Sequence, residues 1–529
     1  MTIQVRTTLD LAQIFRAQQF SEEEARVWPC NRLRTFGLRD DLLNRFSALR
    51  DGTLGDDEDA KTIVDIIRFF WIRLILSLTY SQNLAQGLLE EGISLDCKKR
   101  YPTLFALMSD GPLPDDRFLP MLASGPPRYA KWRWPIRMAR RAAKNSIVRA
   151  FPWPNPGRDG EVITLIEGPL VDQLAVSRNL RPRYCNFDLW FAPTEALPGR
   201  RHGDIAEIFL TEGVKAAETY GVDLRSKSRD WLRQQFKLSA ARVDAHALRL
   251  QSLKIIPSEL WIGSSSSYWP RLLAKEVMRR GGKVVVFDHG FGSGYFDGVD
   301  VPYSMQPFCT EFAIAGGIQA DQIQNFFTSH AIPGMADVTV VPLQESENFN
   351  RATVVKSHPE TRAVGRDIKT IMLLPLPPMG ELFNLTPYPD DWWVQDLNRR
   401  LLADLHELNL QVLVKPHPEF DSSELASVAA GYGAEMIDGR FEETAHLADA
   451  FLFTHPLTST LKYALDNRLP AALIDFGFAL WRPVMKKHLE KDVSIIPGRL
   501  GRDDRMHYER NDLKQWLHCQ DVEAVGAEV

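Results

Sequence analysis

The chain has 529 residues, 44% hydrophobic and 25% charged, and its formal net charge is −5. A chain of this length can bury a large core and form several domains, and its slightly acidic balance argues against a nucleic-acid-binding protein. The five cysteines are odd in number, lie far apart and include no CxxC pair. This pattern fits a reducing compartment and argues against a disulfide scaffold or a zinc cluster.

The N-terminal region is predicted to be helical, because apolar positions recur with helical spacing in 39–50 and 62–80. The second stretch resembles a membrane span, but Asp65, Arg68 and Arg73 interrupt it. We therefore expect a buried amphipathic helix there, since no run of about 20 uncharged apolar residues remains. The first ten residues show neither the basic nor the apolar region of a signal peptide, so a cytoplasmic location is expected.

The segment 131–153 is strongly basic, with seven Lys or Arg and no acidic residue in 131–150. Small and branched apolar residues can share one helical face, and Trp132, Trp134 and Trp153 flank the segment. A basic amphipathic helix with tryptophans at its ends suits peripheral contact with an anionic membrane surface. The alternative is a solvated charged face on a helix docked to the core.

Strands and helices alternate from about residue 160 onward, which predicts parallel sheets with crossover helices. The expected strands of the first unit are 162–166, 260–263, 283–287 and 309–315, with a helix at 270–280. The expected strands of the second unit are 369–375, 410–415, 450–454 and 471–474, with helices at 391–407, 422–430 and 459–467. The sequence thus predicts an α/β protein with two Rossmann-like domains facing across a cleft.

The predicted domain organisation has five parts. They are a helical region (1–155), an N-terminal Rossmann-like domain (156–340), a polar linker (341–366), a C-terminal Rossmann-like domain (367–490) and a C-terminal helical tail (491–529).

Two strands of the second unit end in turns rich in cations, imidazoles and hydroxyls. The strand VLV runs into the turn KPHP, and about forty residues later FLF runs into THPLTST. Such strand ends, opening onto helix starts, are where an open α/β sheet holds a phosphate. A simple N-cap at Thr458 or Ser459 is the alternative for the second turn. The candidate substrate-binding residues are Lys415, His417, Pro418, His455, Thr458, Ser459 and Thr460.

The first unit carries a carboxylate at the end of a very apolar strand, in the sequence Asp288–His289–Gly290. Asp288 is a candidate general base or carboxylate nucleophile, and His289 is a candidate for holding the donor's charge or orienting Asp288. The alternative is an Asp that caps a loop and a His bonded to a carbonyl group. The glycines that follow match neither a P-loop nor a GxGxxG dinucleotide fingerprint.

Two weaker candidates lie at other strand ends of the first unit. Glu167 is a candidate acid or base, because Gly168 and Pro169 fix the turn behind it. Ser264 and Ser265 begin a serine run that is either a donor-binding loop or, by the simpler interpretation, a polar loop with an N-cap.

No metal or other cofactor is expected. The twelve histidines form no HExxH or His-x-His pair, and no Asp-x-Asp follows a strand. A nucleoside monophosphate leaving group does not need Mg²⁺ to neutralise a diphosphate, which favours a CMP-linked donor.

The order of these motifs resembles that of CMP-sugar-dependent glycosyltransferases of the GT-B fold. VVVFDHGFGSGYF is similar to the acidic motif of the bacterial β-Kdo transferases of capsule and O-antigen assembly, KPHP to their HP motif and HPLTST to their Ser/Thr motif. The resemblance covers about 160–480. The related sialyltransferases carry two consecutive acids where this chain has Phe-Asp-His-Gly, which favours Kdo, a 2-keto sugar acid.

The resemblance implies specific roles for residues of both units. His417, Ser459 and Thr460 would bind the CMP phosphate, and Lys415 would add positive charge. Asp288 would be the catalytic nucleophile of a reaction that retains configuration, with Glu167 assisting. The implied partners are a CMP-activated sugar donor and a surface-polysaccharide or lipid-linked glycan acceptor, with no nucleic acid.

Two alternatives to Kdo transfer remain open from the sequence. One is a transferase of CDP-glycerol type or sialic-acid type with the same fold. The other is a non-catalytic nucleotide-sugar-binding subunit that recruits partners through its helical N-terminal region.

Overall fold

The computed structural model describes the greater part of both α/β units and of the helical region. It describes residues 3–5, 32–90, 93–95, 102–109, 113, 160–185, 199–263, 268–288, 293–296, 305–329, 335, 337–343, 368–377, 391–417, 422–456, 458–477, 481–500 and 506–518. The basic segment 131–153 lies outside these residues, so both interpretations of it stay open.

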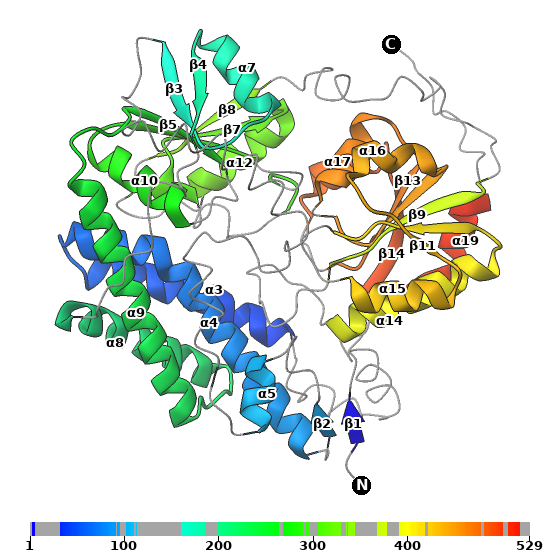
Figure 1. The fold of residues 1–529 in the computed structure, drawn as a ribbon, viewed down its shortest axis with the longest axis horizontal. Helices are drawn as coiled ribbons and strands as arrows, with labels where there is room; N and C mark the ends of the chain where they lie inside the picture. Colours follow the sequence, from blue (N-terminus) through cyan, green and yellow to red (C-terminus); the bar gives the residue numbers. More distant parts are fainter. Residues whose placement is uncertain are drawn as a thin grey trace, which may run out of the picture.

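The chain forms an α/β protein with two separate, mainly parallel sheets (Figure 1). The N-terminal sheet has the order β4-β3-β5-β6-β7-β8, and all its pairs are parallel. Its strands are β3 (Glu161–Thr164), β4 (Arg181–Tyr184), β5 (Glu259–Gly263), β6 (Lys283–Phe287), β7 (Glu311–Ala315) and β8 (Thr339–Leu343). β6 is apolar and buried over its last four residues, as expected of a central parallel strand covered on both faces.

Helices cover both faces of the N-terminal sheet. Helix α7 (Pro169–Ser177) packs in one apolar cluster with Trp261, Val285 and Phe287. Helices α10 (Tyr268–Arg279) and α12 (Gly317–Ser329) pack in another cluster with the alternate residues Leu260, Val284 and Val286. This alternation of side chains between two layers is what a doubly wound sheet requires.

The C-terminal sheet has the order β11-β10-β9-β12-β13-β14-β15, and its last strand is antiparallel. The first six strands follow the Rossmann order, with the third, second and first strands on one side and the fourth, fifth and sixth on the other. They are β9 (Thr370–Leu374), β10 (Gln411–Val414), β11 (Glu435–Met436), β12 (Ala450–Phe453), β13 (Ala471–Asp475) and β14 (Ser494–Leu500), followed by β15 (Met506–Tyr508).

Helices also cover both faces of the C-terminal sheet. Ile371 and Leu373 of β9 pack with α14 (Asp391–Glu407), α15 (Ser423–Gly431) and α19 (Arg510–His518). Met372 and Leu374 pack with α16 (Phe441–Thr444), α17 (Ser459–Asp466) and α18 (Pro483–Leu489).

The helical region is built from two distant parts of the chain. Helices α3 (Arg32–Gly52), α4 (Glu58–Glu90) and α5 (Pro102–Met108) come from the N-terminal region, whereas α8 (Arg200–Thr219) and α9 (Ser226–Gln251) lie between β4 and β5 (Figure 1). Trp71 of α4 stacks on Phe236 of α9 with ring centroids 4.4 Å apart, and its indole N–H donates to Ser239 over 2.8 Å. The predicted helices at 39–50 and 62–80 fall in α3 and α4, and most of the second is buried.

No helix among the described residues is long and apolar enough to cross a membrane. The predicted domain boundaries coincide only in part with the observed elements. β8 ends at Leu343, beyond the predicted boundary at 340, and the predicted helical tail contributes β14 and β15 as well as α19.

Candidate functional site

The strand order of the C-terminal sheet indicates where a ligand would bind, at the carboxyl ends of β9 and of the strands on either side of it. The chain leaves β9 toward β10 and later returns to the other side of β9 as β12. In open parallel sheets, ligands bind at the carboxyl ends of the strands where the order reverses. Lys415 and His417 follow β10, and His455 follows β12, so all three come from strands that flank β9 at this edge.

Lys415 is held in place by the end of the sheet. Its backbone N–H donates to the carbonyl oxygen of Leu373 over 2.9 Å, and the residue is only 8% exposed. Burial lowers the pKa of the Lys415 amine, while the nearby carboxylates of Asp438 and Glu442 raise it. A buried cation of this kind attracts an anionic ligand strongly, because little water screens the attraction between the two charges.

His455 is buried and neutral at physiological pH. The preceding residue, Thr454, donates its backbone N–H to Leu374 over 3.2 Å and accepts the backbone N–H of Leu376 on its hydroxyl over 2.7 Å. Burial, together with the neighbouring His417, lowers the pKa of His455 to about 3. His417 is therefore close enough to act on His455, although β9 separates their strands.

The start of α17 is organised by Thr458. Its hydroxyl accepts the backbone N–H of Thr460 over 3.3 Å and lies 2.6 Å from the Thr460 hydroxyl. The N-cap interpretation is therefore confirmed for Thr458, while Ser459 is exposed at the first position of the helix. Because α17 follows β12, its positive amino end lies on the same side of the sheet as His455.

Asp288 follows β6 of the N-terminal sheet, and hydrogen bonds hold both Asp288 and Ser293 in place. Its backbone N–H donates to Ala313, and the Ser293 hydroxyl donates a short hydrogen bond to its carboxylate. The carbonyl oxygen of Ser293 accepts from Gln319 of α12 over 3.1 Å. Gly294 has φ +84°, and a Cβ there would lie 2.9 Å from the Gln319 carbonyl oxygen, so this turn requires glycine.

The same loop links Asp288 to the C-terminal domain. Tyr295 packs in the apolar cluster of the C-terminal sheet, and its carbonyl oxygen accepts the backbone N–H of Arg482 over 2.9 Å. Phe296 forms an isolated antiparallel bridge to Trp481, with ring centroids 4.3 Å apart. The carboxylate loop of one domain is thus docked on the domain that carries the histidines.

Glu167 lies at the point where the strand order of the N-terminal sheet reverses, between β3 and β5. The hydroxyl of Thr164 donates to the Ile166 carbonyl oxygen over 2.7 Å and holds the turn before Glu167, whose side chain is exposed. One strand, β5, separates β3 from β6, so the strand ends that carry Glu167 and Asp288 are about 10 Å apart.

Four predicted site residues, Ser264, Ser265, His289 and Pro418, lie outside the described residues. Among those described, no group of three or more His, Cys, Asp or Glu side chains could hold a metal ion.

The sequence reasoning missed the surroundings of Lys415. Asp438 and Glu442 act on its charge, and burial together with Glu442 raises the pKa of Tyr463 on α17. The available signal was the Asp–Gly turn that follows the neighbouring strand β11.

A scan against protein-family models finds no match for the sequence, and a search of curated proteins finds none either.

Proposed function

We propose that the chain is a glycosyltransferase of the GT-B type that moves a 2-keto sugar acid, Kdo, from CMP to a surface-polysaccharide or lipid-linked glycan acceptor. The observation that carries the proposal is the convergence of Lys415, His417 and His455 at the reversal point of a Rossmann-order sheet. Those groups suit a phosphate, and the docked Asp288 loop supplies a carboxylate from the other domain.

The donor's single phosphate would take its contacts from the C-terminal domain. Lys415 supplies positive charge, His417 a ring N–H, and α17 the positive amino end of its dipole. The neutral ring of His455 offers one N–H donor and one acceptor nitrogen. This set stabilises a monophosphate leaving group whose negative charge grows as the bond to the sugar breaks.

The chemistry we propose is a double displacement at the anomeric carbon of Kdo. The Asp288 carboxylate attacks that carbon, the bond to the phosphate oxygen breaks, and CMP leaves with the bonding electrons. An acceptor hydroxyl then attacks the same carbon, Glu167 takes its proton, and the ester to Asp288 breaks. Two inversions give net retention. The hydrogen bond from Ser293 fixes one carboxylate oxygen for the first step.

The experiment that tests this function is CMP release from CMP-Kdo with a glycan acceptor. We expect turnover in the wild-type protein and large losses in Asp288→Ala and His417→Ala. Full activity in both variants would refute the site assignment. Turnover with CDP-glycerol or CMP-sialic acid in place of CMP-Kdo would refute the choice of donor, and tight CMP binding without turnover on any acceptor would favour a non-catalytic subunit.

We propose further that the enzyme works at the cytoplasmic face of the inner membrane, held there by 131–153. Co-sedimentation with vesicles containing phosphatidylglycerol tests this, and we expect binding that weakens with salt. Equal binding after Arg137, Arg140 and Arg141 are replaced by Gln would contradict it.

A further inference from the structure

One arginine of the C-terminal domain, Arg482, is held by a helix of the N-terminal domain. Its Nη1 donates to the backbone carbonyl oxygen of Gln322 over 3.1 Å and to the side-chain oxygen of the same residue over 2.9 Å. Its guanidinium also lies over the ring of Phe326, 5.0 Å from the centroid. Gln322 and Phe326 are four residues apart on α12 and therefore share one face of that helix.

The same face of α12 holds the segment that fixes Asp288. Gln319, one turn before Gln322, donates its side-chain amide to the Ser293 carbonyl oxygen over 3.1 Å and is only 5% exposed. The Ser293 hydroxyl in turn donates to the Asp288 carboxylate. Helix α12 therefore contacts both Arg482 and the 293–296 segment, which belong to different domains.

The 293–296 segment and the residues before α18 also bind each other directly. The backbone N–H of Arg482 donates to the Tyr295 carbonyl oxygen over 2.9 Å, and Phe296 packs on Trp481 with ring centroids 4.3 Å apart. Tyr295 is 5% exposed and packs in the apolar cluster that contains the buried residues of α18. Arg482 thus lies where three elements meet, namely α12, the 293–296 segment and α18.

Helix α18 is anchored to the edge of the C-terminal sheet where the donor is proposed to bind. Lys486 of α18 donates to the Asp475 carboxylate over 3.2 Å, and Asp475 also accepts the backbone N–H of Gly477 over 3.1 Å. Asp475 is the last residue of β13, which pairs with β12, the strand that leads to His455. The position of Arg482 therefore follows that of the donor-binding domain.

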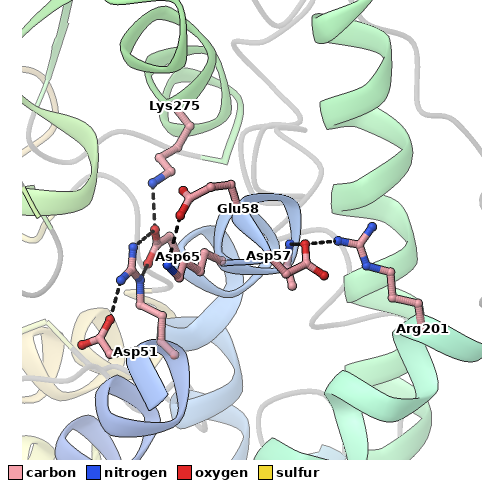
Figure 2. A network of polar contacts seen from close by, with 9 residues as sticks. Asp51, Asp57, Glu58, Asp65, Arg201 and Lys275 are labelled. Carbon is pink, nitrogen blue, oxygen red and sulfur yellow. Dashed lines mark hydrogen bonds and ion pairs between the residues drawn. The ribbon is translucent and has the colours of Figure 1, made fainter. Parts of the chain in front are cut away.

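Helix α12 belongs to a layer that is held together independently of the C-terminal domain. It packs in the same apolar cluster as α10 and α4, and a buried ion cluster joins those two helices. In this ion cluster, Asp65 of α4 accepts from Arg50 over 2.7 and 3.1 Å and from Lys275 of α10 over 2.8 Å (Figure 2). Asp65 is fully buried, so separating the helices would leave a buried charge without its partners.

We propose that Arg482 is a positioning residue that acts through the 293–296 segment and places the Asp288 carboxylate when the two domains are docked. A nucleophile must lie within about 3–3.5 Å of the atom it attacks, and a misplacement of about 1 Å can cost roughly 100-fold in rate. The effect on catalysis rests on the proposed function, whereas the docking of the 293–296 segment by Arg482 does not.

The kinetic test compares two substitutions of Arg482 in CMP release from CMP-Kdo. Arg482→Gln loses the charge over Phe326, and we expect its kcat to fall by roughly 10–100-fold. Its dissociation constant for CMP should change by less than about twofold, because the proposed phosphate contacts do not involve Arg482. Arg482→Lys keeps a charged donor within reach of Gln322 and should recover most of the lost kcat.

A second variant keeps the test decisive if Arg482→Gln does not fold. Gln322→Ala removes one acceptor from a helix that tolerates alanine, and we expect its kcat to fall by about 2–10-fold, as for one lost hydrogen bond. Combined with Arg482→Gln it should add little, since both changes remove the same contact. The control is Arg510→Gln, which loses ion pairs to Asp404 and Glu407 in the same domain and should keep the wild-type kcat.

Hydrogen exchange follows the docking without any turnover. The amide at position 482 is protected by the Tyr295 carbonyl oxygen. After correction for the intrinsic rate, we expect this amide to exchange at least about tenfold faster in Arg482→Gln than in the wild type. The same amide should exchange at the wild-type rate in Arg510→Gln.

Several outcomes would overturn the positioning role. They are wild-type kcat in both Arg482→Gln and Gln322→Ala, unchanged exchange at position 482, an equal loss of kcat in Arg510→Gln, or a loss of CMP affinity as large as the loss of kcat. The last outcome would mean that Arg482 acts on donor binding. A wild-type protein without CMP-Kdo turnover, together with faster exchange in Arg482→Gln, would refute the proposed function and leave the docking of the 293–296 segment standing.

Discussion

The two α/β domains share a parallel sheet wound with helices on both faces, but they offer opposite charges where their strands end. The C-terminal edge carries Lys415, His417 and His455, whereas the N-terminal edge carries Glu167 and Asp288. The first set suits a departing phosphate, and the second suits the positive charge that develops on a sugar carbon. The same sheet architecture can therefore suit a phosphate or a positively charged carbon, because the residues that follow each strand determine the chemistry at its end.

The domains also differ in what covers them. The N-terminal sheet shares its core with the helices α3, α4, α8 and α9. The described C-terminal domain has only the helices of its own crossovers and ends. We expect the acceptor to bind the N-terminal domain and the donor to bind the C-terminal domain.

The largest expected effect separates catalysis from donor binding. We expect Asp288→Asn to lower kcat by roughly 10³–10⁴-fold, because the neutral amide cannot attack the anomeric carbon. The dissociation constant for CMP should not change, since the phosphate contacts lie on the other domain. CMP-release kinetics and calorimetry measure both quantities, with the exposed Asp321→Asn of α12 as control. A loss of CMP affinity in Asp288→Asn as well would contradict the assignment of donor binding to the C-terminal domain.

The next effect concerns the helical layer of the N-terminal domain. Asp65→Ala should lower the free energy of unfolding by about 3–5 kcal/mol, because Arg50 and Lys275 lose their shared buried carboxylate. Glu58→Ala removes an exposed ion pair on the same helix and should have almost no effect. Denaturant unfolding measures both variants. Similar stabilities for the two would show that the ion cluster does not hold α10 to α4.

Loss of the His417 imidazole should weaken donor binding and leave the N-terminal domain unaffected. We expect His417→Ala to bind CMP about 30-fold more weakly, a cost of about 2 kcal/mol for one hydrogen bond to a charged group. The exposed His446→Ala is the control in the same domain. Calorimetry with CMP measures the change, and wild-type affinity in His417→Ala would remove this residue from the donor site.

The pH dependence of stability reports on His455 in the folded protein. Its pKa of about 3 lies below the usual 6.5, so the unfolded chain takes up a proton that the folded state excludes. The stability is complete above pH 6.5 and falls as the pH drops toward 3. By pH 5.5 this residue alone should cost about 1.4 kcal/mol, which His455→Gln should abolish. Equal acid sensitivity in wild type and variant, measured by denaturant unfolding, would show that His455 is not buried as a neutral ring.

The smallest effect tests the start of α17. Thr458→Ala should destabilise the C-terminal domain by about 1 kcal/mol, since the amide of Thr460 loses its cap. Ser459→Ala, one residue on and exposed, should change stability by less than about 0.5 kcal/mol. Denaturant unfolding of both variants is the measurement, and a reversed order of the two effects would contradict the capping geometry.

Much of the fold was predictable, because its signals are local. The strand at 283–287 and the helix at 391–407 have the predicted bounds, and the two imidazole turns follow β10 and β12, the two strands that flank β9 in one sheet. The α8–α9 pair between β4 and β5 was not predicted, since its packing partner α4 lies more than a hundred residues away along the chain.

The ion pair of Lys275 with Asp65 was equally hidden, because only tertiary structure brings α10 to α4. The neutrality of His455 also depends on burial, which the residue type does not reveal. Local patterns therefore located the strand ends, whereas the charge state of their side chains came from packing.

The most direct test of the central claim is the position of CMP in a crystal structure of the complex. The account predicts that the phosphate lies within hydrogen-bond distance of Lys415 and His417, at the start of α17, on the side facing Asp288. CMP bound elsewhere, or a phosphate that touches none of these groups, would contradict it.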